Sequence, residues 1–344
     1  MFWRGGPVGL PIADIAHWLP FALRLIVASR PKRFAVGKVA LTALMAEAIP
    51  AWRRLLASAG APTLLVEDGH YIVWETPEGA KTGRAAWTNA DTGTATFRDA
   101  TSDELAMLAR LTEKPPVDAI RFIGTARIND LGDLIDTLLS EFKCRGGTLQ
   151  TARVDALRIT SDRATVTLDD GTVLQPNYIV VAAGAASGRL LSPLGHTVPL
   201  IAERGYHIQT ADTDWPTDLP PVVFEERAMI VTRFRSGLRA AGFVEFGRID
   251  SPPDPRKWQR LRTHAATLGL SFRQASEWVG ARPTLPDYLP AIGKSRRAAN
   301  LYYAFGHQHL GLTLAAITGE AVGAMIVDQD PRMDLAPFDI DRFA

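Results

Sequence analysis

Cysteine is almost absent from this sequence of 344 residues, and its rarity excludes several kinds of site. Cys144 is the single cysteine, so the chain cannot form an internal disulfide or a zinc site built from cysteine ligands. Nothing points to an oxidising compartment, where proteins commonly rely on disulfides. We therefore expect a cytoplasmic protein with no metal centre.

An excess of either charge is also lacking. The chain has 38 basic and 37 acidic residues, which leaves a net charge of +1. Its basic residues are scattered along the sequence, which argues against a nucleic-acid partner. With 47% apolar residues, a chain of this length can bury a large core and is expected to divide into two domains. This composition is typical of an ordinary soluble enzyme.

A third absence is a clean apolar run long enough to span a membrane. Residues 12–29 are largely apolar, but four residues interrupt them: Asp14, His17, Pro20 and Arg24. We interpret this stretch as a packed or interfacial helix. A basic cluster follows directly: Arg30, Lys32 and Arg33. A solvated helix end explains this cluster, and peripheral contact with the inner face of a membrane is the alternative.

Two kinds of pattern alternate along the chain and predict two interleaved domains. Residues 119–198 and 283–344 have the strand-and-helix rhythm of an α/β domain with a parallel sheet. Residues 1–118 contain helices and a hairpin, and residues 199–282 carry the alternation of an antiparallel sheet. The fold class expected is therefore α/β, in the two-domain α+β sense, with one domain interrupted by the other.

Local signals predict individual elements within these segments. Apolar spacing predicts one long helix over 38–59 and a hairpin formed by 63–66 and 70–74. Ser102 is the expected N-cap of a short helix. Three strands are also expected, the last of them covered on both faces: residues 119–123, a strand that begins at 148, and residues 178–183.

The most informative residues are two linked motifs near the C-terminus. The first contains Gly280-Ala281-Arg282-Pro283, then Asp287, then Pro290-Ala291-Ile292-Gly293. The second is an apolar strand over 301–305, followed by Gly306-His307-Gln308-His309-Leu310-Gly311 at the start of a helix over 310–327. In this order they resemble the C-terminal signature of the D-amino-acid oxidase family, which includes glycine oxidase, sarcosine oxidase and D-amino-acid dehydrogenase.

This resemblance covers nearly the whole chain and implies FAD as the cofactor. Residues 178–187 are similar to the family's middle flavin-contacting strand, and residues 130–154 to its helix and adenine-side strand. Segments 119–198 and 283–344 would then form a Rossmann-like FAD-binding domain, with 199–282 and most of 1–118 as the substrate domain. The implied cofactor-binding residues are Val154, Ala183, Gly184, Gly306, His307, Leu310, Gly311, Leu312 and Thr313.

Physical chemistry is consistent with a flavin beside 306–313. A flavin that accepts hydride gains negative charge near N1 and the C2 carbonyl, and free N–H groups at a helix N-terminus stabilise that charge. Gly306 and Gly311 would let the backbone approach a flat ring. The alternative is an ordinary glycine-rich turn between strand and helix.

Arg282, Tyr206 and His309 are the candidate catalytic residues. The family counterpart of Arg282 binds the substrate carboxylate, and a guanidinium fork can hold a carboxylate bidentately so that Cα–H points at flavin N5. A structural ion pair is the alternative for Arg282. Tyr206 is expected to approach the flavin or the substrate, with packing on the sheet as its alternative.

His309 stands where glycine oxidase-like members carry a second arginine. This departure, within Gly306–Gly311, looks most like the bacterial D-amino-acid and D-hydroxyproline dehydrogenases, so the resemblance implies a small D-amino or imino acid as substrate. A metal at His307 and His309 is not expected, because no cysteine or carboxylate partner is near in sequence. Arg233, Arg235, Arg239 and Glu245 are interpreted as solvent-facing charge pairs.

One family motif is missing from the sequence. Members of the family begin with a strand, a Gly-x-Gly-x-x-Gly turn and a helix that hold the ADP ribose, whereas residues 5–9 have the wrong spacing and are interpreted as a loop. We therefore expect an FAD-binding domain that is incomplete at its N-terminus. The alternative to an enzyme is a non-catalytic remnant or partner subunit that cannot hold FAD alone. The exact substrate, the electron acceptor and the oligomeric state stay open.

Overall fold

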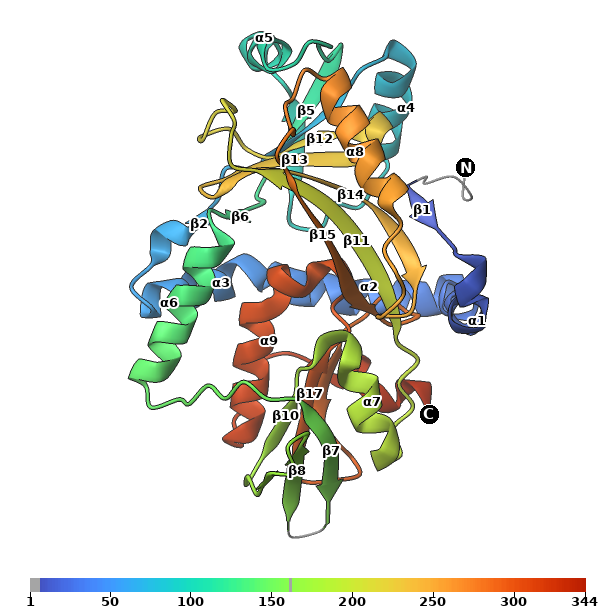
Figure 1. Ribbon diagram of the computed structural model, residues 1–344, viewed down its shortest axis with the longest axis vertical. Helices are drawn as coiled ribbons and strands as arrows, with labels where there is room; N and C mark the ends of the chain where they lie inside the picture. Colours follow the sequence, from blue (N-terminus) through green and yellow to red (C-terminus); the bar gives the residue numbers. More distant parts are fainter. Residues whose placement is uncertain (1–6, 161–162) are drawn as a thin grey trace.

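A large, mainly antiparallel sheet dominates the computed structural model, which describes residues 7–160 and 163–344 (Figure 1). Its strands are β1 (Val8–Gly9), β3 (His70–Trp74), β4 (Thr96–Asp99), β5 (Asp118–Ile123), β11 (Ile201–Thr210), β12 (Val222–Phe224), β13 (Met229–Phe234), β14 (Gly237–Gly247) and β15 (Ser276–Thr284). They run in the order β15-β11-β14-β13-β12-β3-β5-β4, with β1 beside β14. Both β1-β14 and β12-β3 are parallel pairs.

The smaller sheets lie beside and below the large one in Figure 1. Their strands are β2 (Leu65–Val66), β6 (Arg127–Ile128), β7 (Val154–Ile159), β8 (Ala164–Leu168), β9 (Val173–Leu174), β10 (Ile179–Val181), β16 (Ala291–Lys294) and β17 (Leu301–Phe305). β17 lies between β10, which is parallel to it, and β16, which is antiparallel. β7, β8 and β9 form a meander, and β2 pairs with β6. β2 and β6 lie at the left in Figure 1 and the others at the bottom.

Helices cover these sheets and join them. They are α1 (Ile15–Ala28), α2 (Pro31–Ala46), α3 (Ala48–Ser58), α4 (Pro77–Thr88), α5 (Ser102–Arg110), α6 (Leu131–Cys144), α7 (Ser187–Leu191), α8 (Pro255–Thr267) and α9 (Gly311–Ile326). α8 packs on the large sheet through Leu261, in the same core cluster as Tyr206. α3 packs against α9, with Trp52 and Leu314 in one cluster. The expected two-domain α/β fold is confirmed.

Two helical stretches are long and apolar enough to cross a membrane by length and composition, Pro31–Ser58 and Gln308–Ile326. Both contribute side chains to one hydrophobic core cluster, including Leu44, Trp52 and Leu314. Two helices of this kind are weak evidence for a membrane span, because core helices of folded proteins pass the same test of length and composition.

Several local predictions are wrong because they were made without long-range partners. The single helix over 38–59 is two helices that meet at Glu47. The hairpin does not form, because β2 pairs with β6 while β3 lies between β5 and β12. The strand expected from residue 148 begins only at Val154.

Two predictions about sheet membership also need correction. β5 pairs with β3 and β4 in the large sheet, so the α/β segment does not begin at residue 119. β10 is not covered on both faces, since Val180 is 39% exposed whereas Val181 is buried. Residues 5 and 6 of the expected loop lie outside the described residues, but Val8–Gly9 forms a short strand on β14.

The N-cap of α5 is Thr101, and Ser102 is the first residue of the helix. Thr101 Oγ1 accepts the Glu104 N–H at 3.2 Å, and the Glu104 carboxylate accepts the Thr101 N–H at 2.8 Å. We expect Thr101→Ala to lower the free energy of unfolding by about 1 kcal/mol in urea titrations, since this capping box would be lost. Ser102→Ala is the matched control, and equal losses in both variants would contradict the assignment.

Candidate active site

Arg282 lies on β15 directly opposite Glu203 on the neighbouring strand β11. Partners in an antiparallel pair point to the same face, so both side chains leave the sheet together. The guanidinium folds across Gly205, where an added Cβ would collide with it. Glycine at this position is therefore a steric requirement for the observed orientation of Arg282.

Glu203 is the charged neighbour of Arg282, and no motif in the sequence points to it. The residue is 6% exposed, and its Oε2 accepts a hydrogen bond from Thr284 Oγ1 at 2.9 Å. Its Oε1 lies 3.9 Å from Arg282 Nη1, beyond hydrogen-bond length. The side chain of Arg282 makes no hydrogen bond to a described residue. The carboxylate offsets the charge of the guanidinium without occupying its fork.

Burial shapes the ionisation of this group of residues. It lowers the pKa of Arg282, and Glu203 opposes that change, so the guanidinium keeps its charge near neutral pH. His309 lies on the 3-10 turn Gln308–Leu310, and its pKa is lowered. Burial is the largest cause, the charge of Glu203 opposes it, and the charge of Arg282 lowers the pKa further. Its imidazole is thus mainly neutral near pH 7 and can exchange a proton. The fold thus brings Arg282 and His309, two of the predicted catalytic residues, close together.

Tyr206 points away from this site, which corrects its predicted role. Alternation along β11 turns Glu203 and Gly205 to one face and Tyr206 to the other, where it packs against Trp258 with ring centroids 5.4 Å apart. Its hydroxyl donates to Glu245 Oε1 at 3.3 Å and accepts the Asp254 N–H at 3.0 Å. Burial raises its pKa to about 12, so it stays protonated.

The charged residues expected to face solvent differ in how far they are exposed. Arg235 is exposed and pairs with Asp133, as expected. Glu245 is buried and pairs with Arg204 at 2.8 Å, so its prediction is wrong. Arg239 is half-buried and donates to Gln209 Oε1 at 2.9 Å, while its terminal nitrogens have no hydrogen bond to a described residue.

The turn before α9 and the first residues of that helix contain most of the predicted cofactor residues. Gly306 has φ of +80° and packs against Leu285, and buried His307 bonds Thr318 Oγ1 through Nε2 at 3.0 Å. These two residues thus have packing roles that the sequence did not predict. Gln308 has φ of +48° and donates its amide to the Tyr288 carbonyl. Its Oε1 is buried without a partner among the described residues.

The start of α9 is fixed from outside by Trp52. Trp52 Nε1–H donates to the carbonyl oxygens of Leu312 at 3.0 Å and Thr313 at 3.2 Å. No side chain caps the helix, so the N–H groups after Leu310 remain available. The space at Gly311 is also open, because a Cβ added there would meet only His307 Cβ, at 3.9 Å. The sequence showed Trp52 only as one apolar residue in a helical pattern.

The remaining predicted cofactor residues lie around α7. Gly184, with φ of +55° and open space over the position of a Cβ, begins the turn Gly184–Ala186 after exposed Ala183. This turn and Gln308–Leu310 both contact β15, the strand of Arg282. Val154 is tied to the same region because its carbonyl accepts Arg189 Nη2–H at 2.8 Å.

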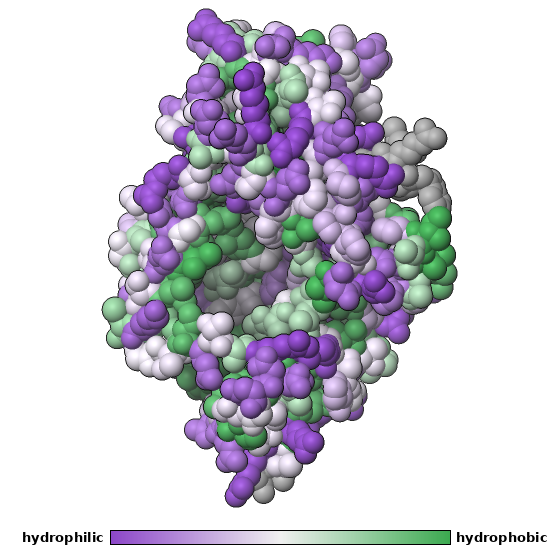
Figure 2. Space-filling view, in the orientation of Figure 1, coloured by the Kyte–Doolittle hydropathy of each residue, from purple (hydrophilic) through white to green (hydrophobic). Residues whose placement is uncertain are grey.

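A cavity of about 1510 Å³ opens next to these elements (Figure 2). Figure 2 shows it as a hollow between the large and small sheets, with apolar residues on its rim. It is lined by Trp52, Thr125, Tyr288, Leu312 and Thr313, among others. Among the described residues, Tyr288 lines the cavity and Arg282 does not. Burial, and to a lesser extent the charge of Glu203, raises the pKa of Tyr288 to about 12. Glu203 thus interacts with both Arg282 and Tyr288, and Tyr288 is the one of these two that lines the cavity.

Comparison with known proteins agrees with this geometry. The architecture is that of flavoenzymes such as glycine oxidase from Geobacillus kaustophilus, with a TM-score of 0.73 at 22% identity over 92% of this chain and 84% of that one. Iminodiacetate oxidase from Chelativorans gives a TM-score of 0.71 at 22% identity, with 86% and 83% covered. The family model described as FAD dependent oxidoreductase (DAO) matches residues 15–325. The chain belongs to this family, and its cofactor is FAD.

Two relatives extend the comparison by sequence. A D-amino-acid oxidase of Bradyrhizobium diazoefficiens is 26% identical over 347 residues, which cover 98% of this chain and 82% of the relative. A D-amino acid dehydrogenase of Paramagnetospirillum magneticum is 31% identical over 195 residues, 55% of this chain and 46% of the relative.

The residues present fit a flavin. Gly184 and Gly311 leave backbone open where a Cβ would otherwise stand, and the start of α9 presents free N–H groups. The orphaned Gln308 Oε1 offers an acceptor for an N–H donor of a bound group. Leu312 and Thr313 would hold the cofactor from the same helix end.

Gly205 gives a direct test of the site geometry. We expect Gly205→Ala to raise KM for the substrate by about tenfold or more, because the added Cβ displaces the Arg282 guanidinium. Tyr206→Phe is the matched control on the same strand. It should leave kcat/KM unchanged and lower the free energy of unfolding by about 1 kcal/mol, since it removes hydrogen bonds on the other face. An unchanged KM in Gly205→Ala would contradict the proposed geometry.

Buried histidines predict a loss of stability in mild acid. Burial lowers the pKa of His207 and of His307 to about 4. Between about pH 6.5 and pH 4 the unfolded chain therefore binds more protons, so stability falls as the pH falls through this window. For His307 the slope is at most about 1.4 kcal/mol per pH unit. Urea unfolding at pH 7 and pH 5 should show a smaller difference in His307→Gln than in the exposed control His17→Gln.

Proposed function

We propose that this protein oxidises a small D-amino or imino acid, of the D-proline or hydroxyproline kind, at Cα. The observation that supports this most directly is the charged fork of Arg282, which is held over Gly205 and makes no hydrogen bond to a described residue. A guanidinium in that state can take an α-carboxylate through two parallel N–H···O bonds. The relatives named D-amino-acid oxidase and D-amino acid dehydrogenase support the same substrate class.

FAD supplies a two-electron acceptor for the hydride that leaves Cα as the C=N bond forms. Arg282 holds the carboxylate and thereby fixes the direction of Cα–H. The amine must be neutral to release the hydride, and the neutral imidazole of His309 can take its proton at a ring nitrogen. Glu203 keeps Arg282 in place across Gly205.

Arg239 supplies hydrogen-bond donors to a second, smaller cavity. This cavity of about 390 Å³ is also lined by His70 and Leu312, and Leu312 lines the larger cavity too. The terminal nitrogens of Arg239 make no hydrogen bond to a described residue and can donate in this space.

Replacement of Arg282 tests the substrate assignment. We expect Arg282→Lys to raise KM for D-proline-like substrates by at least about tenfold with a smaller change in kcat, because lysine lacks the planar fork. Initial rates with an artificial dye acceptor and added FAD would measure both constants. Arg235→Lys, at an exposed ion pair, is the matched control.

Two outcomes would contradict the proposal. Unchanged kinetics in Arg282→Lys would remove the carboxylate assignment. Failure of the FAD-supplemented wild-type protein to reduce dye with any D-amino or imino acid would favour the alternative of a non-catalytic association partner.

A further inference from the structure

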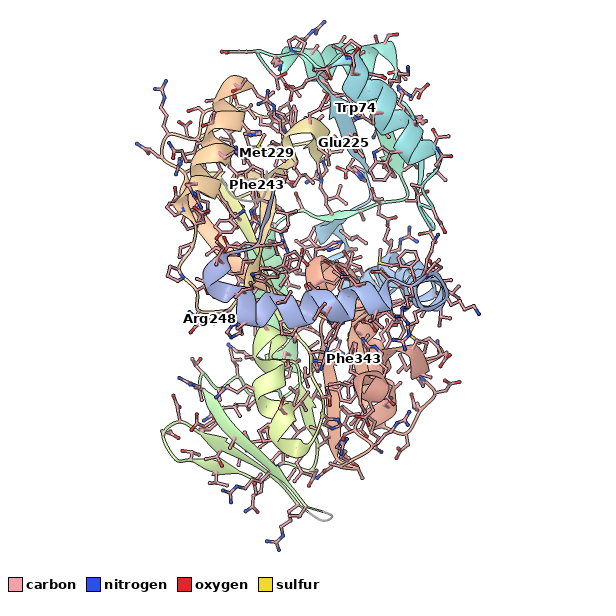
Figure 3. All side chains as sticks on the ribbon, turned by 90° about the vertical axis from the view of Figure 1, so that its right-hand side faces the viewer. Trp74, Glu225, Met229, Phe243, Arg248 and Phe343 are labelled. Atoms are coloured by element: carbon pink, nitrogen blue, oxygen red, sulfur yellow. The ribbon has the colours of Figure 1, made fainter. Side chains whose placement is uncertain are left out.

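α1 presents its apolar side to solvent. Five residues at steps of three or four form one stripe along the outer face of this helix and the turn before it, and each is between 44% and 66% exposed: Ile12, Ile15, Leu19, Leu23 and Ile26. An amphipathic helix on a globular protein normally turns such a stripe to the core. Figure 3 shows α1 across the front of the molecule, between the large sheet and the lower sheets.

The opposite face of α1 is firmly attached, so the outward stripe is a fixed feature. Phe21 is buried and stacks on Phe246 of β14, with ring centroids 6.0 Å apart. Before the helix, the buried Asp14 carboxylate accepts hydrogen bonds from Ser251 Oγ at 2.7 Å and from the Arg248 N–H at 3.3 Å. These contacts prevent α1 from rolling over to bury its stripe.

The apolar surface continues on α2. Phe34, Val36 and Val39 are 61%, 66% and 71% exposed. Leu23, Phe34 and Val36 also line the large cavity, so the surface patch consists of the other five residues: Ile12, Ile15, Leu19, Ile26 and Val39. Five exposed large apolar side chains are unusual for a surface that meets only water. Figure 2 shows apolar residues at the right-hand edge, where β1 leads into α1.

Charge distinguishes this patch from an ordinary protein interface. Residues 12–46 contain five basic residues and one acidic residue, Asp14, which is buried. The basic residues are Arg24, Arg30, Lys32, Arg33 and Lys38, and all but Arg30 also line the large cavity. Among the described residues, Lys38 pairs with Asp91 at 2.8 Å. An apolar stripe with an excess of positive charge beside it matches a membrane surface with anionic lipids.

We propose that α1 and the start of α2 bind the surface of an anionic membrane. The stripe enters the boundary between headgroups and acyl chains, and the basic side chains contact the anionic headgroups. α1 has 14 residues, fewer than the roughly 20 that a transmembrane helix needs, and its inner face is packed, so it lies along the surface. This inference is independent of the substrate.

Flotation of the full chain with lipid vesicles tests the proposal. We expect binding to vesicles of phosphatidylcholine and phosphatidylglycerol at about three to one, and much weaker binding to phosphatidylcholine alone. Leu19→Glu combined with Ile26→Glu should lower the partition coefficient by about tenfold or more, because charge replaces buried apolar area. Neither residue lines the large cavity.

Matched controls separate lipid binding from folding. Val117→Glu combined with Val173→Glu changes residues that are 47% and 54% exposed elsewhere, and this variant should bind vesicles like the wild type. Arg30→Glu, an exposed position without a side-chain cap bond, should weaken binding to anionic vesicles about tenfold and keep the α-helical circular dichroism signal.

Three results would overturn the proposal. The first is wild-type protein that does not float with anionic vesicles. The second is equal flotation of the wild type and the Leu19→Glu/Ile26→Glu variant. The third is a dimer in sedimentation velocity that the same pair of substitutions dissociates, since the stripe would then be covered by a second copy of the chain.

Discussion

The position of Arg282 across Gly205 is the constraint on which the candidate site depends. A guanidinium can lie flat on a sheet only where the strand below has no Cβ, and β11 provides that position two residues after Glu203. The same register brings Glu203 opposite Arg282, where Thr284 holds its second oxygen. Steric, electrostatic and hydrogen-bond requirements thus meet on one pair of strands, and each would be lost if the strands shifted by one residue.

Strand alternation then decides what the rest of β11 can do. Since Glu203 and Gly205 face the site, Arg204 and Tyr206 must face α8, where they share Glu245 as a partner. That buried network lies on the opposite side of the sheet and holds β14 against β11. Next to it, the register between β11 and β14 shifts at Gly205/Tyr206, so the irregularity of the sheet coincides with the glycine that the arginine needs. The site and its support are therefore two faces of one strand.

Sequence reasoning can propose site residues where they are contiguous. Arg282 and the turn before α9 could be proposed because their motifs are local and ordered. Glu203 and Trp52 could not, since an isolated Glu or Trp gains its role only from a partner far along the chain, at Arg282 or at Leu312. The same limit explains β5 and the absent hairpin, because strand pairing depends on tertiary contacts that apolar spacing does not encode. Tyr206 was assigned to the wrong face because strand alternation needs a fixed register.

Trp52 also connects the surface helices to the interior. α1, α2 and α3 follow one another with short breaks. α3 packs against α9, and its Trp52 donates to the carbonyl oxygens of Leu312 and Thr313 at the start of α9. α1 is held separately by Phe21 on β14, the strand paired with β11. The apolar stripe is thus attached to the sheet that carries Glu203. A membrane that binds α1 would therefore meet the site in one orientation, because rotation of α1 would have to break the contact between Phe21 and Phe246 and the hydrogen bonds of Asp14.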